Sequence, residues 1–347
     1  MSHRDITQNY RSLAEHSAPG HCAAVIKADG YGIGALPVAT TLAEAGCQSF
    51  FVADAREGLL LRQQLPESQI FLFDGVSDGD LAEVVKARLI PVLCCEKQHR
   101  LWTHAGGNII AWQVDSGMNR LGFSLQQALK LATADRPPDW IISHFSSADT
   151  PDLPAHQRQL VQLNALRRAF PEAKISLGNT AGIQLSASGS SQMSRCGIGL
   201  YGCNPAPKPT VELTGALRLE GRVLQCRQVA EGNSVGYNAL WSAKSDSILI
   251  TVGLGYADGI PRSLAPSTMV WHQDHPLPIV GRISMDYLVV DASALAAGFG
   301  PDHIAGIQWL TVFNSAHSLD QLAAQAGTIS YELLTRLGPR IERVHEH

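Results

Sequence analysis

The stretch Cys22–Gly34 reads CAAVIKADGYGIG and links the fold of the chain to its chemistry. Its first five residues, Cys22–Ile26, are small or apolar and have the length of a buried strand that leads directly to Lys27. A charged amine is costly beside so apolar a run, so Lys27 either reaches water or is held neutral, for example as an imine with a carbonyl compound. The three glycines and one tyrosine that follow allow the backbone to approach a ligand closely. The stretch therefore predicts a strand that presents a lysine to a binding loop.

Short apolar runs alternate with amphipathic helical patterns along the first two-thirds of the chain. The eight candidate strands are Cys22–Lys27, Ser49–Ala53, Gln69–Phe73, Leu89–Leu93, Asn108–Val114, Trp140–His144, Lys174–Leu177 and Met193–Ile198. The helical patterns include Leu36–Ala45, Arg56–Gln64, Asp80–Ala87, Leu125–Ala132 and Ala155–Ala169. This alternation predicts an α/β fold, either a (β/α)8 TIM barrel or a doubly wound open sheet, and periodicity does not separate the two.

Polar side chains at or near the ends of these runs favour the barrel over the open sheet. They are Lys27, Asp54, Asp74, Asp115, His144, Asn179 and Arg195. The carboxyl ends of the strands in a barrel share one face, which is where active sites are built. We therefore expect these side chains to lie on one face of the molecule.

The pattern changes at about Leu213, where strand-like runs follow one another with turns and few helices between them. These runs are Arg222–Gln228, Ser247–Leu254, Leu277–Ile283, Tyr287–Val290 and Gly306–Val312, and two helical stretches, Leu319–Ala326 and Tyr331–Leu337, close the chain. A proline-rich segment, Asn204–Pro209, marks the junction. We expect a barrel over residues 1–212 and a mostly β domain over residues 213–347.

The composition is that of an ordinary globular protein, with 347 residues, 45% hydrophobic and 17% charged, enough for one or two large cores. A net charge of -4 without runs of Lys or Arg gives no sign of a nucleic acid or an anionic membrane as partner. The seven cysteines are scattered and show no metal-ligand spacing, so we expect reduced thiols in the cytoplasm and no metal site. The amino terminus is too polar for a signal peptide, and no apolar run approaches a membrane span.

Nine motifs in order along the chain resemble those of the alanine racemases, fold-type III enzymes that use pyridoxal phosphate. They are VIKADGYGIG, QVDSGMNRLGF, SHFSSAD, GNTAG, SRCGIGLYG, VGYNALWSA, VGLGYADGIPR, VGRISMD and ISYE, and the resemblance extends from about Asp5 to Arg340. It implies a cytoplasmic homodimer with shared active sites that interconverts L-alanine and D-alanine by a two-base mechanism. It also implies a supply of D-alanine for cell-wall peptidoglycan.

The resemblance assigns Lys27 to the covalent bond with pyridoxal phosphate and then to one of the two bases. The further cofactor-binding residues that it implies are Tyr31, His144, Asn179, Thr180, Arg195, Gly197, Ile198 and Tyr331. Arg195 matches the arginine that faces the pyridine nitrogen. Because a guanidinium does not release its proton, that nitrogen stays an unprotonated acceptor, which favours racemisation over transamination.

Tyr237 matches the second base, which in relatives reaches the active site of the other subunit. A phenol with a pKa near ~10 is a poor base at neutral pH, so cationic neighbours must favour its deprotonated form. Met285 and Asp286 resemble the loop that meets the substrate carboxylate, and Arg120 resembles the arginine near that carboxylate. Tyr256 resembles a residue that lines the entrance of the site.

Two features depart from the family pattern. The strand that usually precedes Asp5 and joins the β domain is missing, which leaves an edge strand unpaired unless another segment compensates. Gln113 stands where many relatives have a lysine that becomes carbamylated and pairs with the arginine matching Arg120. Glutamine can accept that hydrogen bond but carries no charge.

Three alternatives stay open. A racemase of serine or another small amino acid would use the same residues. A decarboxylase of the same fold is disfavoured, because those relatives hold the pyridine nitrogen with a carboxylate and this chain offers Arg195. A non-catalytic pyridoxal phosphate-binding protein with a single barrel would have neither the second domain nor Tyr237.

Overall fold

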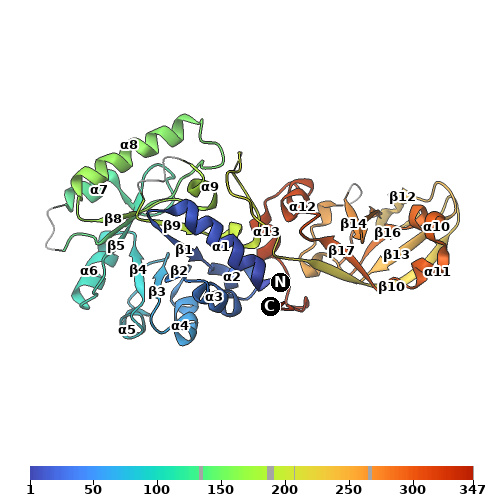
Figure 1. Ribbon diagram of the computed structural model, residues 1–347, viewed down its shortest axis with the longest axis horizontal. Coiled ribbons are helices and arrows are strands. Elements are labelled where there is room, and N and C mark those ends of the chain that lie inside the picture. Colours follow the sequence, from blue (N-terminus) through green and yellow to red (C-terminus); the bar gives the residue numbers. More distant parts are fainter. Residues whose placement is uncertain (133–135, 186–190, 207, 265–267, 347) are drawn as a thin grey trace. The chain divides into compact units, whose positions relative to one another are not determined.

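The computed structural model describes residues 1–132, 136–185, 191–206, 208–264 and 268–346, which form two compact units (Figure 1). The barrel unit comprises His3–Thr214, and the antiparallel unit comprises Met1–Ser2 together with the residues from Gly215 onward. Pro207, in the proline-rich segment expected at the junction, lies outside the described residues. None of the helices in the described ranges combines the length and the apolar character that a bilayer crossing requires.

The barrel unit contains a closed ring of eight parallel strands, because β4 pairs with β5 as well as with β3. This closure confirms the (β/α)8 barrel and excludes the doubly wound sheet. The ring strands are β1 (His21–Val25), β2 (Ser49–Val52), β3 (Gln69–Leu72), β4 (Ile90–Leu93), β5 (Ala111–Asp115), β7 (Trp140–Ile142), β8 (Lys174–Ser176) and β9 (Met193–Cys196). A short strand, β6 (Phe123–Ser124), pairs with the end of β5.

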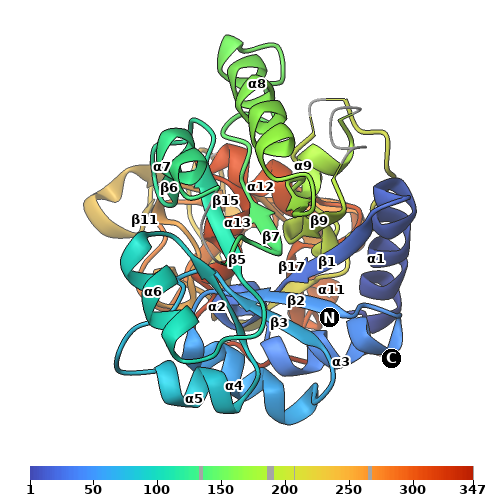
Figure 2. The ribbon, with the colours of Figure 1, turned by 90° about the vertical axis from the view of Figure 1, so that its left-hand side faces the viewer.

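Helices surround the strands of this unit (Figure 2). They are α1 (His3–Ser17), α3 (Ala35–Glu44), α4 (Ala55–Gln64), α5 (Leu81–Lys86), α6 (Glu96–His104), α7 (Leu125–Lys130), α8 (Pro154–Ala169) and α9 (Thr180–Ile183). Local hydrogen bonds set several of their starts. The Asp54 carboxylate accepts the Glu57 N–H at 3.0 Å before α4, and Ser124 and Gln127 form a capping box before α7.

All eight expected barrel strands differ from the observed ones by one to three residues at an end, and two of the differences have a clear local cause. The fifth begins at Ala111 and not at Asn108. The Asp139 carboxylate accepts the Ile110 N–H at 2.7 Å, so this N–H does not pair with a neighbouring strand. The eighth ends at Cys196, and Ile198 belongs to the 3-10 helix η2 (Ile198–Tyr201). The Thr180 hydroxyl accepts the N–H groups of Gly197 and Gly199 at this point and turns the chain out of the sheet.

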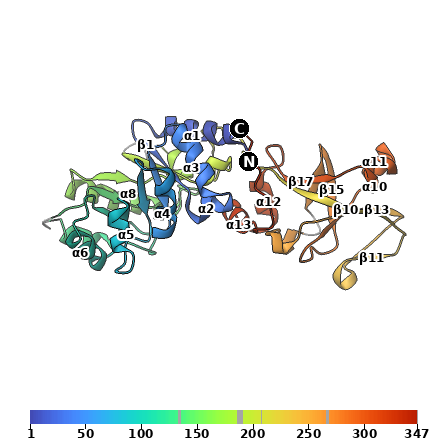
Figure 3. The same cartoon turned by 90° about the horizontal axis from the view of Figure 1, so that it is seen from below.

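The antiparallel unit is built on a closed six-stranded barrel, so this sheet has no unpaired edge within the described residues. Figure 3 shows the unit from below, with β10, β13, β15 and β17 labelled. Its strands, in chain order, are β10 (Leu219–Val229), β13 (Ser247–Val252), β14 (Met269–His272), β15 (His275–Val280), β16 (Leu288–Asp291) and β17 (Trp309–Phe313). Five of them match expected runs. The sixth, β14, carries no clear apolar alternation and is held by its hairpin with β15, where Gln273 adopts a φ of 54°.

Shorter elements complete the antiparallel unit. They are the β11 (Ser234–Val235) and β12 (Trp241–Ser242) hairpin, the 3-10 helices η3 (Tyr237–Ala239), η4 (Tyr256–Asp258) and η5 (Arg262–Leu264), and the helices α10 (Ser293–Phe299), α11 (Pro301–Ala305), α12 (Leu319–Gln325) and α13 (Ser330–Thr335). The sequence pattern missed α10 and α11, which are only seven and five residues long, but it located the two closing helices.

The segment after β1 is a left-handed turn and not the open loop expected from its glycines. Within α2 (Lys27–Gly32), the four residues Ala28–Tyr31 have φ values of 53°, 52°, 62° and 61°. Such a conformation costs about 1–2 kcal/mol for each residue other than glycine. Tertiary hydrogen bonds hold it, because Tyr201 donates to the Gly30 carbonyl and the Asp29 carboxylate accepts the Ala35 N–H at 2.8 Å.

This geometry predicts that Ala28→Gly raises the free energy of unfolding by about 0.5–1 kcal/mol, because glycine removes the left-handed strain at a small cost in unfolded-chain entropy. Ala165→Gly in the middle of the right-handed helix α8 is the matched control and should lower it by about 1 kcal/mol. Urea unfolding of the native protein and of the two variants measures both changes in the free energy of unfolding. A loss of stability in Ala28→Gly comparable to the control would contradict the left-handed assignment.

Candidate active site

Lys27 lies where β1 leads into the left-handed turn, with aromatic rings beneath it. Its amine is 5.5 Å from the centre of the Phe73 ring, and Phe73 packs against Phe51, which in turn stacks on Phe71 at 4.5 Å. Burial and then the charge of Arg120 lower the pKa of Lys27, while Asp74 and Glu57 oppose the shift. The amine is therefore more often neutral than an exposed lysine at the same pH.

Arg195 on β9 is 3% exposed, as the apolar pattern around it predicted. Its guanidinium donates to the Ser176 hydroxyl at 2.7 Å and to the Ser143 carbonyl at 2.7 Å. No ion pair joins it to a carboxylate in the described residues, and no hydrogen bond there uses its Nε–H. Burial lowers the pKa of Arg195 to about 10, which still leaves it charged at neutral pH.

His144 follows β7 and lies against Arg195, with its Nδ1 atom 3.4 Å from the arginine Nη2 atom. Burial, followed by the charges of Arg195, Arg120 and Lys27, lowers the pKa of His144 to about 3. The imidazole is thus neutral at physiological pH. These shifts indicate that the barrel brings Lys27, His144 and Arg195 together, as their positions at strand ends predicted, and that Arg120, which was assigned by resemblance, lies near them.

A set of backbone and hydroxyl groups lies beside this cluster at the start of η2. Thr180, which is 1% exposed, binds the N–H groups of Gly197 and Gly199, and Ile198 occupies the first position of η2, whose N–H has no partner within the helix. A Cβ atom on Gly197 would stand 2.2 Å from the Tyr31 hydroxyl, so Tyr31 closes over this position.

These residues fit pyridoxal phosphate. A lysine with a lowered pKa suits an aldehyde, hydroxyl and N–H donors at a helix start suit a phosphate, and a buried guanidinium with an unused Nε–H suits a ring nitrogen that acts as acceptor. The side-chain oxygen of Asn179, in contrast, accepts the Gly182 N–H at 2.8 Å and so caps α9. Its part in the site is therefore to orient the backbone of Thr180.

Arg120 is held through its backbone and not through its guanidinium. The Asp115 carboxylate accepts the N–H groups of Gly117, Met118 and Arg120 at 2.8–2.9 Å, which shapes the loop. Burial alone would raise the pKa of Asp115, but these N–H donors lower it. In the described residues neither the Arg120 guanidinium nor the Gln113 amide makes a side-chain hydrogen bond. Gly122 packs on Gln113, since a Cβ there would stand 2.8 Å from Gln113 Cγ.

The remaining candidates lie in the antiparallel unit. Tyr237 opens η3 and is 65% exposed, and the preceding Gly236 packs against the backbone of Arg282. Tyr256 in η4 is 44% exposed and its N–H donates to the Ser284 carbonyl at 3.1 Å, beside the exposed Met285. The segment before β16 and the turns at Tyr237 and Tyr256 therefore lie together. Tyr331, at the start of α13, is half-buried.

Two residues of the barrel unit were missed by the sequence patterns. Tyr201 is buried against Tyr31 and holds the left-handed turn, and the GLYG ending of its motif was the available signal. Gln159 on α8 is 1% exposed and binds the Ser116 hydroxyl at 3.0 Å and the His144 carbonyl at 2.9 Å. No pattern distinguishes this glutamine from the other polar residues of α8.

The barrel, its strand-end lysine, and the hydroxyl and N–H groups at the adjoining helix start fit a barrel enzyme of the pyridoxal phosphate class. The family model described as alanine racemase, N-terminal domain, matches residues 2–205, and that of the C-terminal domain matches residues 216–345. The chain belongs to the alanine racemase family.

Individual relatives agree with this assignment. The chain is 37% identical to the alanine racemase of Acidiphilium cryptum over 98% of this chain and 96% of that protein. The structure is similar to the alanine racemase of Bartonella henselae with covalently bound pyridoxal phosphate, with a TM-score of 0.89, 33% identity, and coverage of 100% of this chain and 98% of that one. It is also similar to the biosynthetic alanine racemase of Pseudomonas aeruginosa, with a TM-score of 0.87, 31% identity, and coverage of 100% and 98%.

The lowered pKa of His144 makes stability depend on pH. Between the ordinary pKa of 6.5 and about 3, the unfolded chain binds a proton at this residue that the folded chain does not. Acidification through this range therefore destabilises the fold, on the order of 1.4 kcal/mol for each pH unit. We expect His144→Gln, which cannot titrate, to lose less stability than the native protein between pH 7 and pH 4 in urea titrations. Parallel losses in the two proteins would show that His144 is not neutral in the fold.

Proposed function

We propose that this protein interconverts L-alanine and D-alanine with pyridoxal phosphate by a two-base transfer of the α-proton. The observation that carries the proposal is the cluster at the strand ends. In it, a lysine with a lowered pKa and a buried arginine without a described carboxylate partner both act on His144. When bound, the cofactor withdraws electrons from the α-carbon of an amino acid and so acidifies its α-proton. The side chains of the protein determine which group accepts that proton and which group returns one to the α-carbon.

Lys27 holds the cofactor and then serves as the base on one face of the substrate. Its lowered pKa supports both roles, because the neutral amine is the form that bonds to an aldehyde and accepts a proton. Tyr31, Thr180 and Ile198 would hold the phosphate with hydroxyl and N–H donors. Gly197, whose own N–H donates to the Thr180 hydroxyl at 3.3 Å, would hold that hydroxyl in place beside the phosphate. Tyr331 is assigned to the same role by resemblance.

Arg195 limits how far electrons are withdrawn. Its guanidinium stays protonated at neutral pH, so it would donate a hydrogen bond to the ring nitrogen of the bound cofactor without giving up its own proton. Weaker withdrawal favours return of the proton to the α-carbon over its transfer elsewhere. His144 lies against Arg195 and is neutral, so it orients the guanidinium without adding charge.

We also propose that the active protein is a homodimer in which Tyr237 of one subunit is the second base in the site of the other. The exposure of several large side chains on the antiparallel unit supports this, since Tyr237, Leu240 and Met285 are 65%, 59% and 53% exposed. Met285 and Asp286, with Arg120 of the barrel unit, would meet the substrate carboxylate. Tyr256 would line the entrance.

The cellular role that we propose is the supply of D-alanine for peptidoglycan in the cytoplasm. None of the seven cysteines, all of which lie in the described residues, forms a disulfide, and this is typical of a reducing compartment. Relatives include enzymes named biosynthetic and others named catabolic. Growth of a D-alanine auxotroph that carries this protein, without added D-alanine, tests the biosynthetic direction.

The purified protein with pyridoxal phosphate should form D-alanine from L-alanine, followed by a D-amino-acid oxidase assay. Because a positioned base contributes about 100-fold to 10,000-fold, Lys27→Ala and Tyr237→Phe should each lower kcat by at least about 100-fold. Tyr287→Phe, which removes another exposed hydroxyl of the antiparallel unit, is the matched control and should keep its activity. Absence of D-alanine with loaded native protein would refute the proposed function.

Mixing the two inactive variants tests the shared site. A mixed dimer of Lys27→Ala and Tyr237→Phe contains one site with both bases intact, so we expect up to about a quarter of the native activity to return after subunit exchange, if the chains pair at random and half of the dimers are mixed. Exchange is followed independently with fluorescently labelled subunits. Demonstrated exchange without any return of activity would contradict the sharing of sites between subunits.

We expect the activity not to depend on bicarbonate. Gln113 stands where many relatives have a lysine, and an amide nitrogen does not add to carbon dioxide as a neutral lysine amine does. The native protein should show the same rate in bicarbonate-free and bicarbonate-supplemented buffer. Gln113→Lys should acquire a bicarbonate-dependent rate, since it places an amine near the Arg120 loop. A bicarbonate effect in the native protein would mean that another amine carries a carbamate.

A further inference from the structure

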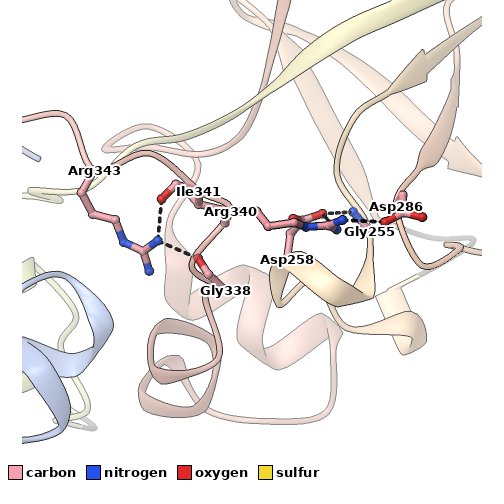
Figure 4. A network of polar contacts seen from close by, with 7 residues as sticks. All are labelled: Gly255, Asp258, Asp286, Gly338, Arg340, Ile341 and Arg343. Atoms are coloured by element: carbon pink, nitrogen blue, oxygen red, sulfur yellow. Dashed lines mark hydrogen bonds and ion pairs between the residues drawn. The ribbon is translucent and has the colours of Figure 1, made fainter.

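Arg340 bridges two separate turns of the antiparallel unit (Figure 4). Its Nε and Nη2 atoms bind the two oxygens of the Asp258 carboxylate at 2.8 and 2.9 Å, and its Nη1 atom binds Asp286 at 2.7 Å. One guanidinium thus uses three of its nitrogens on two carboxylates that are far apart in the sequence. This planar fork geometry is available to arginine and not to lysine.

The first of these carboxylates is buried. Asp258 is 5% exposed, and besides Arg340 it accepts the Gly255 N–H at 2.9 Å, which closes the turn that contains Tyr256. The hydrogen bond to Asp286, followed by those to Asp258, raises the pKa of the Arg340 guanidinium, so the cation is held beside the buried Asp258 carboxylate, which needs a charged partner. The shape of the Gly255–Asp258 turn therefore depends on Arg340.

The second carboxylate belongs to the Ser284–Tyr287 turn, which lies directly on the first turn. The N–H groups of Tyr256 and Ala257 donate to the carbonyls of Ser284 and Met285 at 3.1 and 3.0 Å. A Cβ atom on Gly255 would stand 2.2 Å from the Met285 carbonyl oxygen, so the two backbones touch. A change in the position of either turn would move both Tyr256 and Met285.

The segment that carries Arg340 is itself fixed to the first turn. The Gly338 N–H donates to the Asp258 carbonyl at 3.1 Å, and a Cβ atom on Gly259 would stand 2.4 Å from the Arg336 carbonyl oxygen. Arg340 therefore projects from a firm base and not from a free chain end. Its neighbour Arg343 donates to carbonyls of its own segment, including those of Gly338 at 2.6 Å and Leu337 at 2.9 Å.

We propose that Arg340 is a positioning residue that clamps the Gly255–Asp258 and Ser284–Tyr287 turns together and so sets the substrate-carboxylate loop at Met285 and Asp286. The proposal rests on the proposed function, which assigns that loop to the alanine carboxylate. The clamp acts on binding of the carboxylate and not on the bases. Loss of the clamp should therefore raise KM much more than it lowers kcat.

Two measurements on the full-length holoenzyme test the clamp. In Arg340→Gln we expect KM for alanine to rise about tenfold while kcat stays within about threefold of the native value. Amide hydrogen exchange at Tyr256 and Ala257 should become at least about tenfold faster, because these N–H groups hold the two turns together. Arg343→Gln removes a guanidinium from the same segment and should leave KM, kcat and these amides unchanged.

The alternative outcomes separate the clamp from the proposed function. If Arg340→Gln does not fold, Arg340→Lys keeps a cation beside Asp258 but loses the fork, and we expect a smaller rise of KM and of amide exchange. If a folded Arg340 variant keeps the native KM, with or without a fall of kcat, the positioning role is wrong. If amide exchange at Tyr256 and Ala257 is unchanged in that variant, the clamp itself does not exist. If the native holoenzyme forms no D-alanine, the proposed function fails while the exchange measurement still decides whether the clamp exists.

Discussion

The buried guanidinium of Arg195 is the constraint on which the barrel unit depends. A charge in a barrel interior is tolerated only when its hydrogen bonds are made, and Arg195 makes them with the Ser176 hydroxyl and the Ser143 and Leu177 carbonyls. These acceptors come from the strands and loops next to β9, so the positions of three neighbouring strand ends are coupled through one side chain. Burial, followed by the same charge, lowers the pKa of His144 and keeps its imidazole neutral.

The left-handed turn after β1 shows the same coupling in the backbone. Three of its four residues are not glycine and have φ values above 50°, a conformation that local preferences disfavour. Tyr201, from the segment after the last barrel strand, offsets the strain by binding the Gly30 carbonyl. The first and last barrel strands therefore cooperate to place Lys27 and Tyr31, which lie at the point where the ring closes.

Much of this arrangement could be predicted from the sequence, because apolar runs bounded by polar residues mark parallel strands clearly. Lys27, His144 and Arg195 were found by their position at strand ends. The left-handed turn was not, because glycines predict freedom and the hydrogen bond from Tyr201 is tertiary. β14 was missed since Trp271 and His272 give no alternation, and Arg340 was missed since a surface arginine has no pattern that marks its two carboxylate partners.

The charge balance of the site explains why it favours anionic ligands. Besides burial, the charges of Lys27, Arg120 and Arg195 each lower the pKa of His144, so three cations act on one small region. Asp74 offsets their charge only in part. Its own pKa is raised by burial and by the nearby Asp54. A phosphate or an amino-acid carboxylate that enters this region replaces repulsion among cations with attraction. Binding of an anionic cofactor should therefore stabilise the barrel as well as equip it for catalysis, since a ligand that binds only the folded state shifts unfolding by mass action.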